Sequence, residues 1–237
     1  MKRIATLFFV SFFVSIMTVS AAEFSADMVT EVMGMKTTGK IYFRSYRTQR
    51  TDAEMMGMRV NQIVNYPKSY QLYTDTQKYV VSDIEEMRKQ NPMAGVDSFE
   101  GFIKTNHFNK TGTETVEGYK CDIYEGNAIL GEGQPAMPMK VWYSSKLDYA
   151  VKTEVTMPAP MSAKMVSVTK NIKTGKQPNE LFEIPSGYSE ARDTQEAMGM
   201  GGFGMPAGGD SDEMPSREDM QRMMESMKDM MNRSRGE

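Results

Sequence analysis

Two runs of alternating apolar and polar residues constrain the fold of this chain more than any other stretch. They lie within residues 113–154, as TETVEGYKCDIYEG and MKVWYSSKLDYAVKTEV, on either side of a Gly- and Pro-rich connection. Side chains alternate between the two faces of a strand, so Cys121 and Ile123 are expected to share one face, with Trp142 on the face opposite Val141 and Tyr143. The pattern predicts antiparallel strands joined by turns.

The same kind of alternation recurs along most of the chain. Further strands are predicted at residues 23–35, 40–46, 59–65, 69–74, 77–82 and 162–173. A turn is expected at Thr37-Thr38-Gly39. A connection is expected at Tyr66-Pro67, because proline cannot donate to a strand ladder. Two short helices are predicted at residues 83–90 and 98–104, the first capped by Ser82 or Asp83, and a single helical turn at residues 178–182.

A meander of this length must close or curl, and inserted helices can cover the hollow of a curled sheet. The sequence therefore predicts a mainly β (α+β) fold. The expected architecture is an open antiparallel half-barrel covered by one or two inserted helices, plus a flexible tail that ends in an amphipathic helix. The mouth of such a half-barrel is a natural site for an apolar ligand.

Three motifs carry a family resemblance: GTETVEGYKCDIYE at residues 112–125, KVWYSSKLDYAVKTE at residues 140–154 and LFEIPSGY at residues 181–188. They resemble an uncharacterised family of exported bacterial proteins that is similar to the LolA/LolB lipoprotein-carrier superfamily. The resemblance covers about residues 24–188 and not the tail. It implies a helix-covered half-barrel that acts in the periplasm on something apolar, since carriers of that superfamily hold acyl chains in the hollow.

The first 22 residues have the pattern of a secretory signal peptide. Lys2 and Arg3 precede an apolar run, and Ser20-Ala21-Ala22 forms a small-residue exit. The alternative is an uncleaved anchor helix, but the run is short for a membrane span. Cleavage after Ala22 would leave a chain without a cysteine at its start, so a soluble periplasmic protein that is not lipidated is expected.

Charge and cysteine content exclude several classes of function. Loss of Lys2 and Arg3 changes the net charge from −3 to −5, and the segment from Ser189 onward also carries −5. The body between is near neutral and has no basic field to hold nucleic acid. Cys121 is the single cysteine, so an intrachain disulfide and a cysteine-based zinc site are excluded.

The tail has a different composition from the body. Residues 189–215 are rich in Gly, Met and polar side chains and predict a flexible linker, which ends the half-barrel domain at residue 188. Residues 216–237 predict a helix that begins with a capping-box pattern at Ser216 and Asp219. One stripe of this helix consists only of methionines: Met220, Met223, Met224, Met227, Met230 and Met231.

This methionine stripe has three interpretations. It packs back onto the body of the same chain, or it docks on a partner, a membrane surface or a ligand, for which flexible thioether side chains are suited. The third interpretation is Cu(I) or Ag(I) binding, for which the candidate ligands are Met220, Met223, Met224 and Met227. The motif MGM also occurs at Met33, Met56 and Met198.

No catalytic constellation is evident. His107 is the only histidine, and no neighbour supplies metal-ligand spacing. A pairing of His107 with Cys121 as base and nucleophile lacks an orienting third group, so Cys121 is expected to be a small buried side chain. Trp142 is a candidate for lining the hollow, with core packing as the alternative.

The leading hypothesis is therefore an exported periplasmic carrier, not an enzyme and without a cofactor, that binds a lipid or a lipidated segment in the half-barrel hollow. Trp142 and the methionine stripe are its candidate binding residues. One alternative is methionine-mediated handling of Cu(I) or Ag(I). Another is an envelope protein-interaction module without a small ligand, and peripheral membrane contact is left open.

Overall fold

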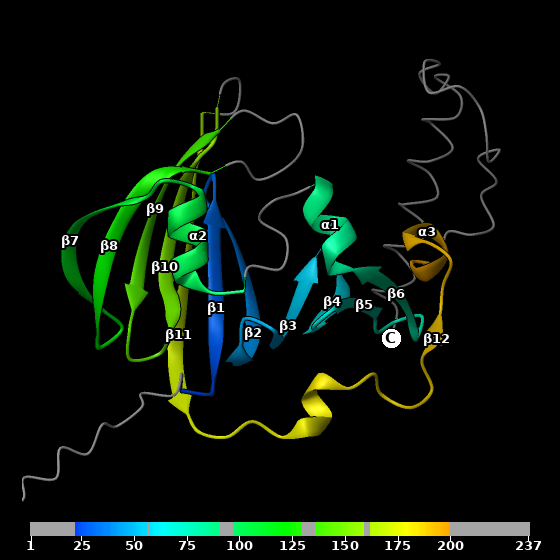
Figure 1. The fold of residues 1–237 in the computed structure, drawn as a ribbon. Coiled ribbons are helices and arrows are strands. Elements are labelled where there is room, and N and C mark those ends of the chain that lie inside the picture. The colour runs from blue at the N-terminus through cyan, green and yellow to red at the C-terminus, as the bar shows by residue number, and fades with distance from the viewer. Residues whose placement is uncertain (1–21, 56, 91–96, 129–135, 159–161, 200–237) are drawn as a thin grey trace, which may run out of the picture.

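A single twelve-stranded sheet forms the body of the protein in the computed structural model, which describes residues 22–55, 57–90, 97–128, 136–158 and 162–199 (Figure 1). The strand order across the sheet is β12-β6-β5-β4-β3-β2-β1-β11-β10-β9-β8-β7. The first six strands are β1 (Phe24–Val32), β2 (Met35–Ser45), β3 (Thr48–Met55), β4 (Met58–Asn65), β5 (Lys68–Tyr73) and β6 (Lys78–Asp83). The others are β7 (Asn109–Val116), β8 (Tyr119–Ala128), β9 (Met137–Ser144), β10 (Tyr149–Thr156), β11 (Lys164–Thr174) and β12 (Ser189–Glu190).

The sheet is open, because its edge strands β7 and β12 do not pair with each other. Neighbouring strands are antiparallel except for the two-residue pairing of β12 with β6, which is parallel. The first strand, β1, lies in the middle of the sheet between β2 and β11. The predicted mainly β fold with an open antiparallel half-barrel is thus confirmed.

Two helices follow β6 and cover one face of the sheet (Figure 1). Helix α1 (Ile84–Gln90) begins after Asp83, whose Oδ1 accepts hydrogen bonds from the backbone amides of Glu85 and Glu86 at 2.9 and 3.3 Å. Helix α2 (Phe99–Thr105) begins after Ser98, whose Oγ accepts from the amide of Gly101 at 3.1 Å. Both predicted helices are confirmed, and Asp83 is one of the two caps predicted for the first.

The face that carries α1 and α2 is called the helix-covered face below. Helix α2 is fixed to it by aromatic stacking, since the ring of Phe99 lies 4.0 Å from that of Tyr143 and parallel to it within 4°. Val141 and Tyr124 project from the same face. Residues that alternate with these, such as Trp142 and Cys121, project from the opposite face.

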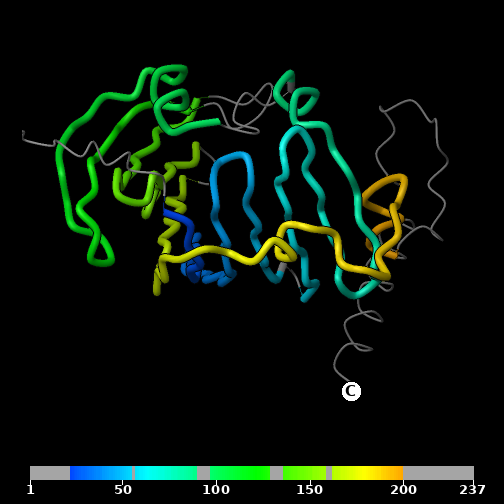
Figure 2. The backbone as a smooth tube through the Cα atoms, turned by 60° about the horizontal axis from the view of Figure 1, so that its bottom comes forward, coloured from blue at the N-terminus to red at the C-terminus, as the bar shows by residue number. Residues whose placement is uncertain are grey.

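The opposite face of the sheet's other half is covered by the chain that follows β11. A 3₁₀ turn, η1 (Asn179–Phe182), buries Phe182 against Ile63 and Leu72. The guanidinium of Arg44 lies 4.5 Å from the centre of the Phe182 ring and donates to the carbonyl of Gln177 at 2.7 Å. Figure 2 shows this stretch running from the end of β11 to the β12 edge. The predicted helical turn at residues 178–182 is confirmed.

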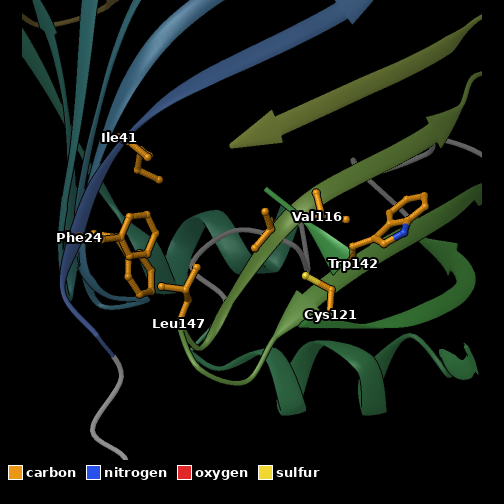
Figure 3. Packing of buried hydrophobic residues seen from close by; sticks show 9 residues of the cluster. Phe24, Ile41, Val116, Cys121, Trp142 and Leu147 are labelled. Carbon is orange, nitrogen blue, oxygen red and sulfur yellow. The ribbon is translucent and has the colours of Figure 1, made fainter. Parts of the chain in front are cut away.

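The largest buried cluster lies where β1 and β2 meet the β7–β10 strands (Figure 3). Phe24 and Ile41 pack with Leu147 of the β9–β10 turn, and Cys121 and Trp142 continue the same cluster toward β8 and β9. Every one of these side chains is at most 3% exposed. Such a cluster ties the beginning of the folded chain to its middle.

The turn predicted at Thr37-Thr38-Gly39 is wrong. The chain reverses instead at Met33-Gly34, with φ of 51° and 78°, and β2 already begins at Met35. Gly39 lies inside β2. A glycine is needed there because β3 passes too close to leave room for a side chain. A Cβ at Gly39 would lie 2.6 Å from the carbonyl oxygen of Asp52. A glycine in a strand often marks such a close approach of two backbones rather than a turn.

Two further boundaries differ from the sequence prediction. Strand β3 was not predicted, because its sequence TQRTDAEM is polar on both faces and shows no apolar alternation. The first residues of the linker predicted from Ser189 belong instead to the folded body, because they form β12 and helix α3 (Thr194–Ala197). Ala191 and Ala197 are buried with Val60 and Tyr73. The predicted signal peptide except Ala22, the remainder of the linker and the methionine-stripe helix lie outside the described residues.

Candidate functional site

A pocket of about 410 Å³ lies between α1 and the helix-covered face of the sheet. Ile84 and Met87 project into it from α1. Met28 of β1, Val64 of β4 and Ala150 of β10 contribute apolar side chains from the sheet. The pocket therefore spans strands from both halves of the sheet, and its volume is within the range of small-molecule sites in proteins, about 300–1,000 Å³. It is called the α1 pocket below.

Strand register explains why these residues meet. Thr153 lies opposite Ser167, Thr169 lies opposite Met28, and all four project from the helix-covered face. Residues three positions apart in a regular strand project from opposite faces. The β9–β10 ladder has a bulge between Ala150 and Lys152, and for this reason Ala150 and Thr153 both line the pocket. A bulge commonly re-aims side chains in this way.

The polar part of the lining consists of hydroxyl and amide side chains. They are Gln49, Gln62, Ser69, Thr153, Ser167 and Thr169. Gln62 donates to Ser69 at 3.3 Å, and the hydroxyls of Ser167 and Thr30 are 2.9 Å apart. The Gln49 amide has no hydrogen-bond partner among the described residues. The lining is thus mixed, whereas the sequence predicted a mainly apolar hollow.

An aromatic cluster forms one end of the pocket. Tyr46 and Tyr149 line it, and their rings pack edge-on against Phe43 with centroids 5.4 and 5.0 Å away. Burial raises the pKa of Tyr149 to about 12, against the opposing effect of its hydrogen bond with Thr169. Burial, together with the nearby carboxylate of Asp148, also raises the pKa of Tyr46, whose buried hydroxyl has no partner among the described residues.

None of the described residues that line the α1 pocket is charged. The arginines nearest in sequence to its polar side chains are held elsewhere. Arg47 and Arg88 both bind the carboxylate of Asp97, with nitrogen–oxygen distances of 3.2 and 2.9 Å. This pairing links the β2–β3 turn to α1 and to the start of α2. Arg50 projects from the opposite face, where it pairs with Asp52 at 2.6 Å.

A second, more open cavity has a different character. It encloses about 790 Å³ and is lined by charged side chains, among them Asp27, Lys40, Glu54, Arg59 and Lys170. Burial of an apolar ligand against these groups would remove water from charges. This cavity is therefore a poor site for the apolar ligand expected from the sequence.

A row of apolar side chains crosses the helix-covered face near the ends of five strands. From β9 to β2 the register places Met139, Val155, Met165, Val32 and Met35 side by side. Met139 packs against the α2 cluster, whereas the side chain of Met35 is 69% exposed. The row, called the methionine row below, leads from beneath α2 to the rim of the sheet.

Trp142, a predicted binding residue, lies on the face opposite the α1 pocket and does not line it. It is 3% exposed, and its Nε1 donates to the carboxylate of Glu114 at 2.6 Å. The ammonium of Lys152 lies 4.0 Å from the centre of its ring, so Trp142 has a cation–π contact as well. The other predicted binding residues, the six methionines of the tail stripe, lie outside the described residues.

The residues that do line the pocket were not singled out from the sequence. Gln49 lies in the strand that was not predicted, and Tyr46 lies in the turn before it. Thr153 and Ser167 lie in predicted strands, but polar side chains on a strand are ordinarily assigned to a solvated face. Only the strand register together with the position of the helices identifies these polar side chains as pocket residues.

His107 and Cys121 are not brought together as a catalytic pair. His107 is exposed in the turn before β7. Cys121 instead lies opposite Glu114 of β7, which is seven positions after His107 in the chain. The Cys121 thiol is buried and donates to the carbonyl of Tyr119 at 3.4 Å. Burial raises its pKa, which disfavours the thiolate.

No three His, Cys, Asp or Glu side chains within the described ranges are grouped closely enough to hold a metal ion. None of the helices in the same ranges combines the length and the apolar character that crossing a bilayer requires.

Solved structures similar to this one share low sequence identity with it. The complex of Pseudomonas aeruginosa MucA and MucB is 11% identical over 70% of this chain and 56% of that chain, with a TM-score of 0.45. An uncharacterized conserved protein from Thermus thermophilus is 11% identical over 73% and 91%, with a TM-score of 0.49. A LolA superfamily protein from Nitrosomonas europaea is 8% identical over 69% and 90%, with a TM-score of 0.39. In the comparison with MucB, this chain spans little more than half of the length of the MucB chain.

No curated protein sequence matches the chain. One family model does, over residues 23–150, which is more than half of the chain and includes the first of the three sequence motifs. The predicted membership of an uncharacterised family is confirmed by this match. The chain belongs to the family described as Domain of unknown function (DUF4412).

Proposed function

We propose that this protein is a carrier that binds the acyl chain of a lipid or lipidated segment in the α1 pocket. The observation that supports this function is the pocket itself, which lies between α1 and the centre of an open sheet. Met28, Val64, Ile84 and Met87 offer apolar surface on opposite sides of it. A ligand held between them would be shielded from water by both the helix and the sheet.

The hydrophobic effect makes this proposal quantitative. Each buried methylene contributes about 0.8 kcal/mol, which corresponds to about a four-fold gain in affinity per methylene. A series of acyl chains should therefore bind with regularly rising affinity until the pocket is full, and then level off. A chain that bound only at the exposed surface would show a weaker dependence on length and no levelling.

The test is uptake of a neutral fluorescent probe, N-phenyl-1-naphthylamine, by protein from which lipid has been removed. Saturable fluorescence enhancement that acyl chains reverse is expected. Thr153→Phe should weaken it, because Thr153 lines the pocket and a ring there would occupy ligand volume. The matched control is Thr115→Phe on the edge strand β7, where the side chain is exposed. Equal uptake by both variants, with circular dichroism showing that both are folded, would place the ligand elsewhere.

Export to the periplasm is part of the same proposal. It is supported by the pattern of residues 1–22, which is that of a signal peptide. Cell fractionation with mass spectrometry of the mature N-terminus tests it. A chain that begins at Glu23 in the periplasmic fraction is expected, and a chain that retains its apolar start would contradict the cleavage.

The methionine stripe of the tail is proposed to dock on the methionine row. The row and α3 belong to the same face, because Val60 and Tyr73, against which α3 packs, also project from the helix-covered face.

Deletion of residues 216–237 should speed release of the probe, since an apolar cover would be lost. Replacement of the six stripe methionines by leucine should leave release unchanged, because leucine keeps the apolar surface. A loss of Cu(I) binding in the leucine variant would favour the soft-metal alternative instead.

A further inference from the structure

The charge around the α1 pocket limits which ligand it can hold, if the proposed carrier function is correct. Its described lining offers hydroxyl and amide groups but no ammonium or guanidinium. A carboxylate or phosphate drawn into it would lose its water without gaining an opposite charge. Such transfer is costly, whereas a neutral ester, amide or hydroxyl needs only hydrogen bonds.

Neighbouring cations do not remedy this. Arg47 and Arg88 share the carboxylate of Asp97, and the Arg47 guanidinium also lies 4.4 Å from the centre of the Tyr66 ring. Arg88 in addition pairs with Glu85 at 3.0 Å. Recruitment of either arginine by a ligand would break contacts that join α1 to the sheet.

The Asp148 carboxylate brings a negative charge to the aromatic end of the pocket. The Asp148 carboxylate accepts a hydrogen bond from the Tyr143 hydroxyl at 2.6 Å, and it acts electrostatically on Tyr46, which lines the pocket. An anionic head group at this end would meet a charge of its own sign. Burial also raises the pKa values of Tyr46 and Tyr143, so these phenols stay neutral.

Gln49 provides what a neutral head group requires. It lines the pocket, and its amide, unpartnered among the described residues, offers a donor and an acceptor. Thr153 and the Ser167–Thr30 hydroxyl pair extend the polar surface across the sheet. We propose that the α1 pocket selects uncharged amphiphiles, namely acyl chains that end in an ester, amide or hydroxyl group, over the same chains with a carboxylate or phosphate.

The experiment compares two ligands of equal chain length, dodecanoate and monododecanoylglycerol, as competitors of N-phenyl-1-naphthylamine on the full exported chain at neutral pH. The neutral ligand should compete at least about ten-fold better than the carboxylate, because the carboxylate must be desolvated without a partner. Competition by dodecanoate at the same concentration as the monoglyceride would overturn the inference and leave the carrier function intact. Absence of saturable probe binding, or of competition by either ligand, would overturn both.

A gain-of-function variant tests the cause. Gln49→Lys places an ammonium in the pocket and should improve competition by dodecanoate at least about ten-fold, as a charge partner offsets part of the desolvation. The matched control is Gln71→Lys, at an exposed glutamine of β5, two strands away from β3, that does not line the pocket. If both variants change dodecanoate binding equally, net charge rather than the pocket controls selectivity, and the inference fails. If neither does, pocket charge is not the determinant, and the inference fails as well.

Discussion

The close approach of β2 and β3 at Gly39 leads to a sharp prediction for Gly39→Ala. The added Cβ would lie 2.6 Å from the carbonyl oxygen of Asp52 and 3.5 Å from the Cβ of Ala53. Ordinary contact begins near 3.4 Å, so the two strands would have to separate by about 0.8 Å. The obstacle is backbone rather than a flexible side-chain end, so the strain cannot be relieved by a rotamer change.

The magnitude follows from two opposing effects. Overpacking of a closely packed site costs about 1–3 kcal/mol. Alanine also restricts the unfolded chain relative to glycine, which contributes about 0.4–1 kcal/mol in the stabilising direction. The net expectation for Gly39→Ala is a loss of about 1–2 kcal/mol in the free energy of unfolding, or about 2–8 °C in Tm.

Urea denaturation followed by the emission of Trp142, the single tryptophan, measures this change. The control is Gly112→Ala on β7, where the nearest atom to the new Cβ is Ile123 Cδ1 at 3.7 Å, an ordinary contact. Gly112→Ala should be neutral or slightly stabilising. Equal stability of the two variants would refute the idea that Gly39 is required by the approach of β3.

Two further predictions concern α3 and Trp142. Hydrogen bonds from Arg192 and Lys78 lower the pKa of Glu196 to about 2, so its contribution to stability is present above its ordinary pKa of 4.5 and is lost as the pH falls through about 2. Glu196→Gln should abolish that pH dependence, measured as the urea midpoint from about pH 6 to pH 2, and an unchanged pH profile would contradict it. Trp142→Phe removes the hydrogen bond to Glu114 and should cost about 1–2 kcal/mol. Probe uptake should be unchanged in this variant, and its loss would show that the tryptophan contacts the ligand after all.

Sequence patterns predicted most of the architecture because most strands bury one face. The alternation in β8 and β9 correctly placed Cys121 on one face with Ile123, and Trp142 on the face opposite Val141. Helix α1 was predicted from its composition and from a capping side chain, which act locally. These signals depend only on neighbours in sequence, and the family motifs agreed with them.

The parts that were not predicted depend on distant contacts. Strand β3 presents Gln49 and Thr51 toward the hollow and Arg50 toward Asp52 on the other face, so neither face has an apolar pattern. Gly39 was assigned to a turn because its neighbours in sequence do not indicate that the backbone of Asp52 lies against it. The pocket escaped prediction for the same reason, since its polar side chains become a site only when α1 is placed over them.

The central place of β1 has a consequence for how the chain reaches this structure. Synthesis produces β1 first, yet one of its two partner strands comes near the end, as in the contact between Thr30 and Ser167, which are 137 positions apart. Until β11 arrives, one side of β1 has unpaired amides and carbonyls, and such an edge invites pairing with other chains. Nascent or translocating molecules should therefore need protection by a holding chaperone until the last long strand is added, and truncation before Lys164 should produce aggregates.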